Sequence, residues 1–316
     1  MVLSLLSALA VKSPEHIRIV DQFYPRAVHL RSAFDRNFRD PRQAHAMRFV
    51  WDYWHIPGQY TLHRTMAADY FEQEEFDALT SALTEFGQQE LGCRAITPPW
   101  LSFYVDGCEQ QLHADVPQGP FAYVLSLTNW DGRSFRGGET QIMQPSVLDY
   151  WRAFDSSQGL ELTDLLLDVP PLFNRLTIFD ARIPHGVRRV DGVHDPREAR
   201  LVLHGWFCEN EPYVSGDMDE ETVSEGLTAP LRRISEILAP PFVIGLLSVR
   251  MDIIEDGSVA ALFVLADTMV ADPSQTGRTT EDARAFVHRT VKRELKSASF
   301  TPQTQPCSIY IPFVFD

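Results

Sequence analysis

The chain has 316 residues, of which 44% are hydrophobic and 22% are charged, as in ordinary globular proteins, and this argues against a disordered chain or a fibre. The length predicts one large domain and a smaller one. The formal net charge of -15 argues against nucleic acid and against an anionic membrane surface as partners, because binding either would need a basic face.

The cysteines and the first residues bear on the compartment. The four cysteines, Cys93, Cys108, Cys208 and Cys307, are far apart and form no CxxC pair, which indicates neither a zinc ribbon nor a disulfide scaffold. The opening MVLSLLSALAV is apolar, but it lacks a positively charged start and is too short to span a bilayer, so a signal peptide is only weakly supported. We therefore expect a cytoplasmic protein with free thiols.

The N-terminal part mixes strand-like and helix-like segments. Residues 16–25 alternate apolar and polar side chains like a short strand, and a helix is predicted over 26–38. The aromatic-rich segment 47–64 predicts strands, and the segment 70–92 has helical periodicity with a glycine stop. We expect a helical cover at roughly 14–95. Trp51, Tyr53, Trp54 and Tyr60 could wall a substrate pocket, but aromatic residues on strands more often belong to the core.

The middle of the chain, roughly 96–210, consists of short strand-like runs separated by glycine and proline turns. These runs are residues 100–106, 121–130, 139–145, 174–181 and 199–207. Many short strands with turn signals indicate a sandwich or a barrel, and a double-stranded β-helix, the jelly roll, fits the number of runs. We therefore predict a mainly β domain with a helical cover over residues 1–210.

The C-terminal part predicts a second, α+β domain. Residues 211–232 are acidic and poorly periodic, so we interpret them as a linker. The following domain, 233–316, has the order β-β-α-β: two strands around the turn at 255–257, a helix over 280–297 and a closing strand over 307–315.

A candidate metal site begins in QLHADVPQGP, residues 111–120. On a strand, residues two apart project from the same face, so His113 and Asp115 can aim a nitrogen and a carboxylate oxygen into one barrel mouth. His185 follows a predicted strand and offers a third ligand. Two histidines and a carboxylate form the facial triad that holds iron(II) and leaves positions open, although such a set also suits zinc with a bound water. A histidine and an aspartate at this spacing also recur by chance on strand edges.

Arg200 begins the predicted strand after His185. Its guanidinium can clamp a carboxylate through two parallel hydrogen bonds, as an acidic cosubstrate would require. Alternation along the strand places Arg200, Val202, His204 and Trp206 on one face. An arginine in a surface ion pair is the alternative interpretation.

The chain resembles the iron(II)/2-oxoglutarate-dependent dioxygenases of the prolyl-4-hydroxylase-like group over roughly residues 98–208. The motifs that carry the resemblance are HAD, RGGET, FNRLTIFDARIPHGV and REARLVLHGWF, in that order and close to the spacing of the group. The resemblance implies that His113, Asp115 and His185 are the catalytic metal ligands for iron(II), with 2-oxoglutarate as a cosubstrate that chelates the metal and O2 as the oxidant. Ascorbate is a candidate reductant. Halogenating relatives replace the carboxylate, so Asp115 favours hydroxylation.

The same resemblance implies a cosubstrate site around Arg200, which would pair with the far carboxylate of 2-oxoglutarate. A hydroxyl from a neighbouring strand often assists that arginine, and Tyr104 and Ser126 are the candidates. His204 occupies a position that would lie beside the cosubstrate.

The segment 249–268, the predicted helix after it and the ending YIPFVFD resemble the C-terminal domain of TonB-like energy transducers. The resemblance implies a recognition module for a protein partner or for self-association, for example by adding a strand at a sheet edge. A domain that merely supports the oxygenase is the alternative.

The leading hypothesis is an iron(II)/2-oxoglutarate oxygenase that hydroxylates an unactivated C–H bond of a protein side chain or a small molecule and releases succinate and CO2. The alternatives are a metal-loaded 2-oxoglutarate sensor that acts through its C-terminal module and, with Arg200 left unexplained, a zinc hydrolase. Oxygen-dependent succinate formation separates the first from the second.

Overall fold

The computed structural model describes residues 16–38, 51–145, 161–272 and 276–315, with the isolated positions 147, 157 and 159. The apolar opening and residues 47–50 of the predicted strand segment lie outside the described residues. The chain divides into two compact units. Unit 1 comprises Met1–Thr84 and Ile96–Cys208, and unit 2 comprises Glu85–Ala95 and Glu209–Asp316.

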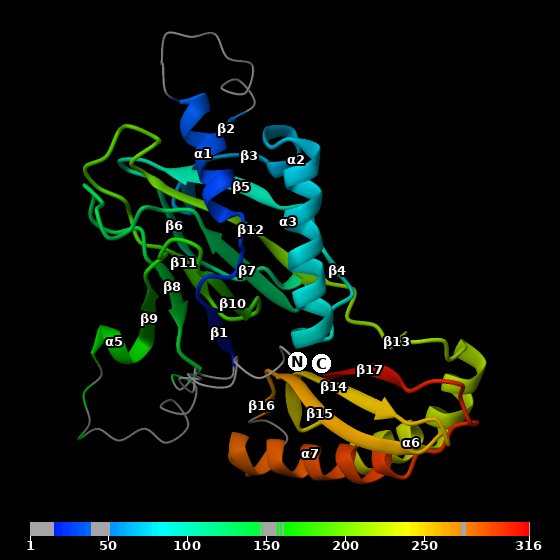
Figure 1. Ribbon diagram of the computed structural model, residues 1–316. Coiled ribbons are helices and arrows are strands. Elements are labelled where there is room, and N and C mark those ends of the chain that lie inside the picture. Colours follow the sequence, from blue (N-terminus) through cyan, green and yellow to red (C-terminus); the bar gives the residue numbers. More distant parts are fainter. Residues whose placement is uncertain are drawn as a thin grey trace. The chain divides into compact units, whose positions relative to one another are not determined.

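Unit 1 is built on one large sheet, of twelve strands in the described residues, whose principal order is β1-β10-β7-β12-β5-β3-β6-β11-β8-β9 (Figure 1). Neighbours along this order pair antiparallel. The sheet curls, as expected of a jelly-roll core, and the prediction of a mainly β unit is confirmed. Its strands are β1 (Ile17–Val20), β2 (Asp52–Ile56), β3 (Tyr60–Met66), β4 (Ala95–Ile96), β5 (Trp100–Tyr104), β6 (Glu109–His113), β7 (Phe121–Ser126), β8 (Thr140–Met143), β9 (Leu166–Val169), β10 (Leu176–Asp180), β11 (His185–Val187) and β12 (Arg200–Cys208).

The central strands explain why the sheet forms from this sequence. All five residues of β10 are buried, and β12, which pairs with β5 and β7, is buried or half-buried along its whole length. A strand covered on both faces needs a nearly continuous run of apolar side chains, and LTIFD and RLVLHGWFC supply such runs. The polar members of these runs, Arg200 and His204, therefore stand inside the unit.

Helices α1 (Ala27–Asn37) and α3 (Gln73–Phe86) cover the sheet. Each buries one apolar stripe: Leu30 and Phe34 from α1, and Leu79 and Leu83 from α3. The predicted helical cover, 14–95, is only partly helical, because β1, β2 and β3 also lie within it and join the sheet. Shorter helical turns of unit 1 are α2 (Ala67–Tyr70), η3 (Val116–Gln118) and α5 (Leu162–Leu165), and the turn η2 (Gly87–Leu91) belongs to unit 2.

Unit 2 is a sheet of order β13-β17-β14-β15, with β16 paired to β14, and two helices pack on one of its faces (Figure 1). Its core joins Leu227 and Ile234 of one helix, Val287 and Val291 of the other, and Val249 of the sheet. The elements are β13 (Tyr213–Ser215), α6 (Glu220–Leu238), β14 (Val243–Ile253), β15 (Val259–Asp267), β16 (Val270–Ala271), α7 (Thr280–Lys296) and β17 (Cys307–Phe315).

The acidic segment 211–232 is not an irregular linker, because it folds as β13 and much of α6. Asp219 caps α6 by accepting a hydrogen bond of 2.8 Å from the backbone N–H of Thr222. Gly226 and Pro230 conceal the helical pattern in the sequence, yet Gly226 is needed because a Cβ there would lie 2.4 Å from the Phe300 ring. Within the described part of the chain, no helix combines the length and apolarity that crossing a membrane requires.

Candidate metal centre and its pocket

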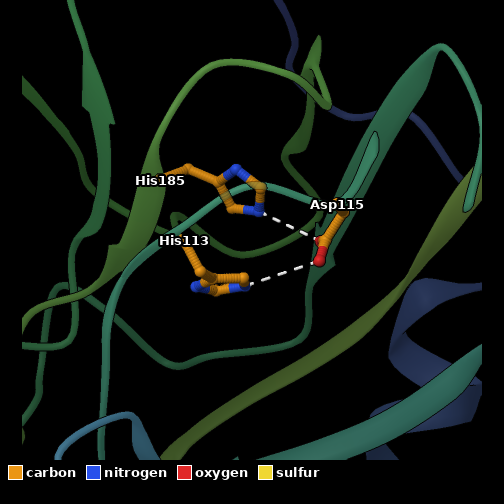
Figure 2. A group of neighbouring side chains, drawn as sticks. All are labelled: His113, Asp115 and His185. Carbon is orange, nitrogen blue, oxygen red and sulfur yellow. Dashed lines mark hydrogen bonds and ion pairs between the residues drawn. The ribbon is translucent and has the colours of Figure 1, made fainter. Parts of the chain in front are cut away.

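The three predicted metal ligands come together at the ends of two paired strands. His113 ends β6 and His185 begins β11, and the two residues lie directly opposite each other in the antiparallel pair. Asp115 follows β6 and is held by its N–H, which donates to the Ala181 carbonyl at 2.8 Å. One ligand atom from each of His113, Asp115 and His185 lies within 4.8 Å of the others (Figure 2). Since β6 ends at His113, a backbone turn rather than strand alternation brings Asp115 to the site.

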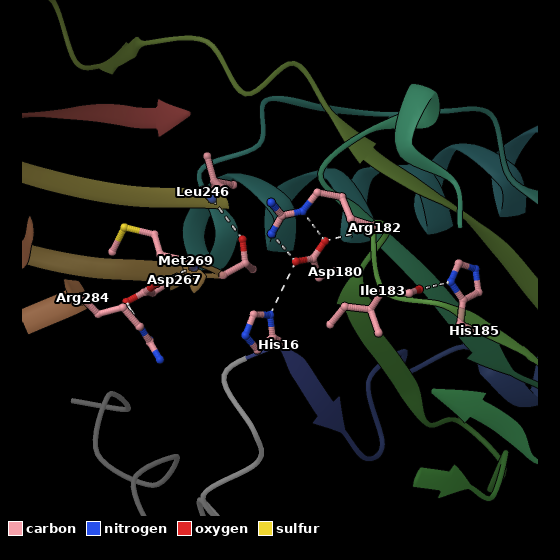
Figure 3. Close-up of polar contacts among 10 residues, drawn as sticks. His16, Asp180, Arg182, Ile183, His185, Leu246, Asp267, Met269 and Arg284 are labelled. Atoms are coloured by element: carbon pink, nitrogen blue, oxygen red, sulfur yellow. Dashed lines mark hydrogen bonds and ion pairs between the residues drawn. The ribbon is translucent and has the colours of Figure 1, made fainter. Parts of the chain in front are cut away.

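Hydrogen bonds fix which ring nitrogen each histidine presents. Nδ1 of His113 lies 2.8 Å from the Gln111 carbonyl oxygen, and Nδ1 of His185 lies 2.9 Å from that of Ile183 (Figure 3 shows the latter). A carbonyl oxygen only accepts, so Nδ1 carries the proton and Nε2 presents its lone pair. Both Nε2 atoms face the Asp115 carboxylate, at 3.8 Å from Oδ1 for His113 and 3.2 Å from Oδ2 for His185. Electron pairs that converge in this way repel unless a cation or a proton lies between them.

The surroundings keep Asp115 charged and the rings in place. Burial opposes ionisation of Asp115, but when the rings carry a second proton, the hydrogen bond and charge of His185, the charge of His113 and a hydrogen bond from Trp206 outweigh the effect of burial, so the pKa of Asp115 lies below its ordinary value. The indole Nε1–H of Trp206 donates to Asp115 Oδ2 at 3.2 Å. The Phe179 ring packs against His185 with 4.6 Å between ring centroids.

Arg200 lines the same pocket and is almost fully buried, at 1% exposure. Its Nε donates to the Gly138 carbonyl at 2.8 Å and its Nη2 to Thr140 Oγ1 at 3.1 Å, while its guanidinium lies 4.5 Å from the centroid of the Tyr104 ring. The Nη1 group is buried and meets no hydrogen-bond acceptor among the described residues. Burial lowers the pKa of Arg200, and nearby Tyr104 and Glu139 oppose that shift. The arrangement leaves one buried cationic donor that needs an anion.

Of the two hydroxyls considered for this arginine, only one lies at the pocket. Tyr104 lines it opposite Arg200 in the β5–β12 pair, and burial raises the pKa of Tyr104, so its hydroxyl stays protonated. The Ser126 hydroxyl donates to the Pro171 carbonyl at 2.7 Å and accepts from the Thr128 N–H at 3.1 Å, outside the pocket lining.

His204 lies on the pocket side of β12, with Nε2 2.8 Å from the Ser102 hydroxyl oxygen. Burial, helped by the positive charges of Arg200 and Arg64, lowers the pKa of His204 to about 3. The imidazole is therefore neutral at physiological pH. Val202 and Trp206 line the same pocket, as the alternation along this strand predicts.

Sequence reasoning missed other residues of the pocket, which is a cavity of about 350 Å³. Thr140 is the last residue of the RGGET motif, and that motif was its only sequence signal. Arg64 had no signal. Trp54 and Tyr60 line the pocket and also pack against a buried hydrophobic cluster, whereas Trp51 packs on Phe103 at 4.8 Å between ring centroids. Tyr53 is 62% exposed.

No protein-family model matches the chain, and no curated protein matches it at a significant level. Solved structures are similar to it. A prolyl-4-hydroxylase from Pseudomonas putida has 16% identity, covers 61% of this chain and 92% of its own, and gives a TM-score of 0.42. A prolyl hydroxylase from Trichoplax adhaerens, in complex with a hypoxia inducible factor peptide fragment, has 14% identity. It covers 61% of this chain and 84% of its own, with a TM-score of 0.43. HygX from Streptomyces hygroscopicus, with nickel and 2-oxoglutarate bound, has 12% identity. It covers 61% of this chain and 83% of its own, with a TM-score of 0.39. At such TM-scores these similarities carry no argument about activity, so the function is inferred from the residues of the site.

Proposed function

We propose that the protein is a non-haem iron(II)- and 2-oxoglutarate-dependent oxygenase that hydroxylates an unactivated C–H bond of a small molecule or a protein side chain. One observation carries this proposal: the Nε2 atoms of His113 and His185 converge on the Asp115 carboxylate in the same pocket as the unpaired Nη1 group of Arg200. A metal triad alone would suit several reactions. The buried guanidinium of Arg200 in the same pocket needs an anion as its partner, and an anionic cosubstrate would supply one.

The triad residues would hold iron(II) through two imidazole nitrogens and one carboxylate oxygen, which leaves the remaining coordination positions open to the pocket. When bound, iron(II) and 2-oxoglutarate supply the oxidation, in which O2 is consumed and succinate and CO2 are released. The chain orients the ligands: the Gln111 and Ile183 carbonyls set the tautomers, and Trp206 holds one oxygen of Asp115. Ascorbate as a reductant stays a prediction.

Arg200 and Thr140 would together receive the far carboxylate of 2-oxoglutarate. Thr140 Oγ1 accepts from Arg200 Nη2, so the threonine proton is free to donate to a carboxylate oxygen. Nη1 of Arg200 would donate to the other oxygen. We therefore assign the assisting hydroxyl to Thr140, with Tyr104 packed against the guanidinium. The buried position of both donors excludes water from this charged contact.

Oxygen-dependent succinate formation tests the proposal. The purified protein with iron(II) and labelled 2-oxoglutarate should release labelled succinate slowly in air even without a primary substrate, and not under nitrogen. The Asp115→Ala variant should lose this activity, whereas the Asp168→Ala variant, altered outside the pocket lining, should keep it. Binding of 2-oxoglutarate without its consumption would instead indicate the sensor. Hydrolysis with zinc and no 2-oxoglutarate requirement would indicate the hydrolase.

A recognition or self-association role for unit 2 stays a prediction. Strand β15 ends the sheet order, and Phe263 and Val264 on it are 42% and 51% exposed. A strand at the end of a sheet offers backbone groups to a further strand, which is the mode of recognition expected from the sequence.

A further inference from the structure

A second arginine, Arg64 on β3, lines the pocket and is not among the residues proposed to hold the metal or 2-oxoglutarate. Its guanidinium carbon lies 3.6 Å from the centroid of the Trp54 ring and 4.1 Å from that of Trp100. Strand β3 pairs with β2, which carries Trp54, and with β5, which carries Trp100, so an indole reaches it from each neighbouring strand. Stacking on two indoles holds the guanidinium plane in place, and its N–H groups then point outward from its edge.

The charge of Arg64 is not neutralised within the described residues. Its Nε is buried without a hydrogen-bond acceptor, and no described carboxylate forms an ion pair with it. Asp52 lies opposite Arg64 in the β2–β3 pair, but its side chain is exposed. Burial lowers the pKa of Arg64, and Asp52, Tyr60 and Tyr104 oppose that shift. A half-buried guanidinium whose donors are unused is a binding group for an anion.

When the charges of the loaded pocket are summed, the positive charge of Arg64 is not balanced. In the proposed function, on which this inference rests, the two charges of iron(II) balance the two carboxylates of 2-oxoglutarate. Asp115 then balances Arg200, and His204 is neutral because of its lowered pKa. Glu139, which also acts on Arg200, pairs with Arg188 outside the pocket lining. Among the lining residues, Arg64 thus retains one positive charge without a counter-charge. A substrate with one negative charge would complete the balance.

We propose that Arg64 binds a carboxylate of the primary substrate, which makes the substrate class small carboxylic acids. The planar fork of a guanidinium matches a carboxylate through two hydrogen bonds. The cavity of about 350 Å³ lies at the lower end of the range for small-molecule sites, and it must also hold 2-oxoglutarate. This favours a small acid over a bulky one.

Calorimetric titration of the full-length protein loaded with Zn(II) and one equivalent of 2-oxoglutarate tests the proposal without turnover. The probes are acetate, hexanoate and benzoate, each compared with its uncharged amide. At least one acid should bind to the wild type about tenfold or more tightly than its amide, and the Arg64→Gln variant should lose this preference. The Arg64→Lys variant, which keeps the charge but not the fork, should bind the acid with intermediate affinity.

Arg133 provides a matched control. Its guanidinium lies 3.6 Å from the centroid of the Trp130 ring and its Nε is also buried without an acceptor in the described structure, but it does not line the pocket. The Arg133→Gln variant should bind the acid like the wild type. If no acid is preferred over its amide by the wild type, or if the Arg64→Gln and Arg64→Lys variants bind the acid as the wild type does, the proposal is wrong.

The failure of this inference can be distinguished from the failure of the proposed function. The Arg64→Gln variant should bind Zn(II) and 2-oxoglutarate with wild-type affinity, since neither His113, Asp115, His185 nor Arg200 contacts Arg64 through a hydrogen bond or ion pair in the described structure. A wild type that binds 2-oxoglutarate but shows no preference for acids overturns only the role of Arg64. A wild type that does not bind 2-oxoglutarate overturns both.

Discussion

Replacing Arg200 with methionine removes a buried charge while keeping most of the side-chain length. The guanidinium now donates to the Gly138 carbonyl and to Thr140 Oγ1, and its Nη1 is left for a ligand. A hydrogen bond between charged groups contributes about 1.5–3 kcal/mol, so the variant should bind 2-oxoglutarate about ten- to a hundred-fold more weakly. Its affinity for the metal should not change, because no triad residue bonds to Arg200.

Ligand-induced stabilisation of the Zn(II)-loaded protein measures this loss. At a 2-oxoglutarate concentration about 100 times the wild-type Kd, the ligand should raise the free energy of unfolding of the wild type by about 2.7 kcal/mol. For the Arg200→Met variant the same concentration should add only about 0.4 to 1.4 kcal/mol. The Arg188→Met variant, whose side chain is 46% exposed and pairs with Asp168, is the control and should respond like the wild type. Equal stabilisation of Arg200→Met and wild type would refute the assignment.

Further predictions follow from the same geometry. The Trp206→Phe variant loses the 3.2 Å hydrogen bond to Asp115, so its metal Kd, measured by competition with a chelator, should rise about ten- to a hundred-fold; an unchanged Kd would contradict this role. The pKa of His204 is lowered in the folded state to about 3 from its ordinary 6.5, so the unfolded state binds more protons below pH 6.5 and stability falls as the pH falls. From about pH 7.5 to about pH 5.5 the wild type should lose about 1 kcal/mol more in denaturant unfolding than the His204→Gln variant; parallel curves would show that this histidine does not contribute. A Cβ at Gly186 would lie 2.4 Å from the Gln110 carbonyl oxygen, between the two strands that carry the histidines, so Gly186→Ala should lower stability by about 1–3 kcal/mol and weaken metal binding; a wild-type thermal midpoint would contradict this packing.

The candidate metal site could be predicted from the sequence because its residues carry chemical signals. These signals are a histidine and an aspartate two positions apart, a second histidine after a buried strand, and an arginine at the start of the next strand. They occur in this order along the chain. The structure brings the first three, His113, Asp115 and His185, within 4.8 Å and places Arg200 in the same pocket. The spacing of these residues did not predict the turn after β6. A hydrogen bond from the Asp115 N–H to the Ala181 carbonyl positions Asp115, and no local sequence pattern encodes this contact.

The rest of the pocket depends on contacts between residues far apart in the chain. Arg64 meets Trp100 only because β3 joins the sheet beside β5; the sequence predicted strands over 47–64 but not which strands they pair with. In the same way, the sequence did not predict α6, because its first half is acidic and it contains Gly226 and Pro230. The packing of Phe300 at Gly226, which accounts for this glycine, is a long-range contact. Strand order and close packing of this kind are tertiary facts that local propensity does not contain.

Anaerobic addition of iron(II) and then 2-oxoglutarate to the apoprotein tests the central claim most directly. Chelation of triad-bound iron(II) by the keto acid should give a visible metal-to-ligand charge-transfer band at one equivalent of each. The Asp115→Ala variant should not form the band, and the Arg200→Met variant should need about ten- to a hundred-fold more 2-oxoglutarate to form it. A folded wild-type protein that shows no band at saturating iron(II) and 2-oxoglutarate would contradict the assignment of His113, Asp115 and His185 to an iron(II)/2-oxoglutarate site.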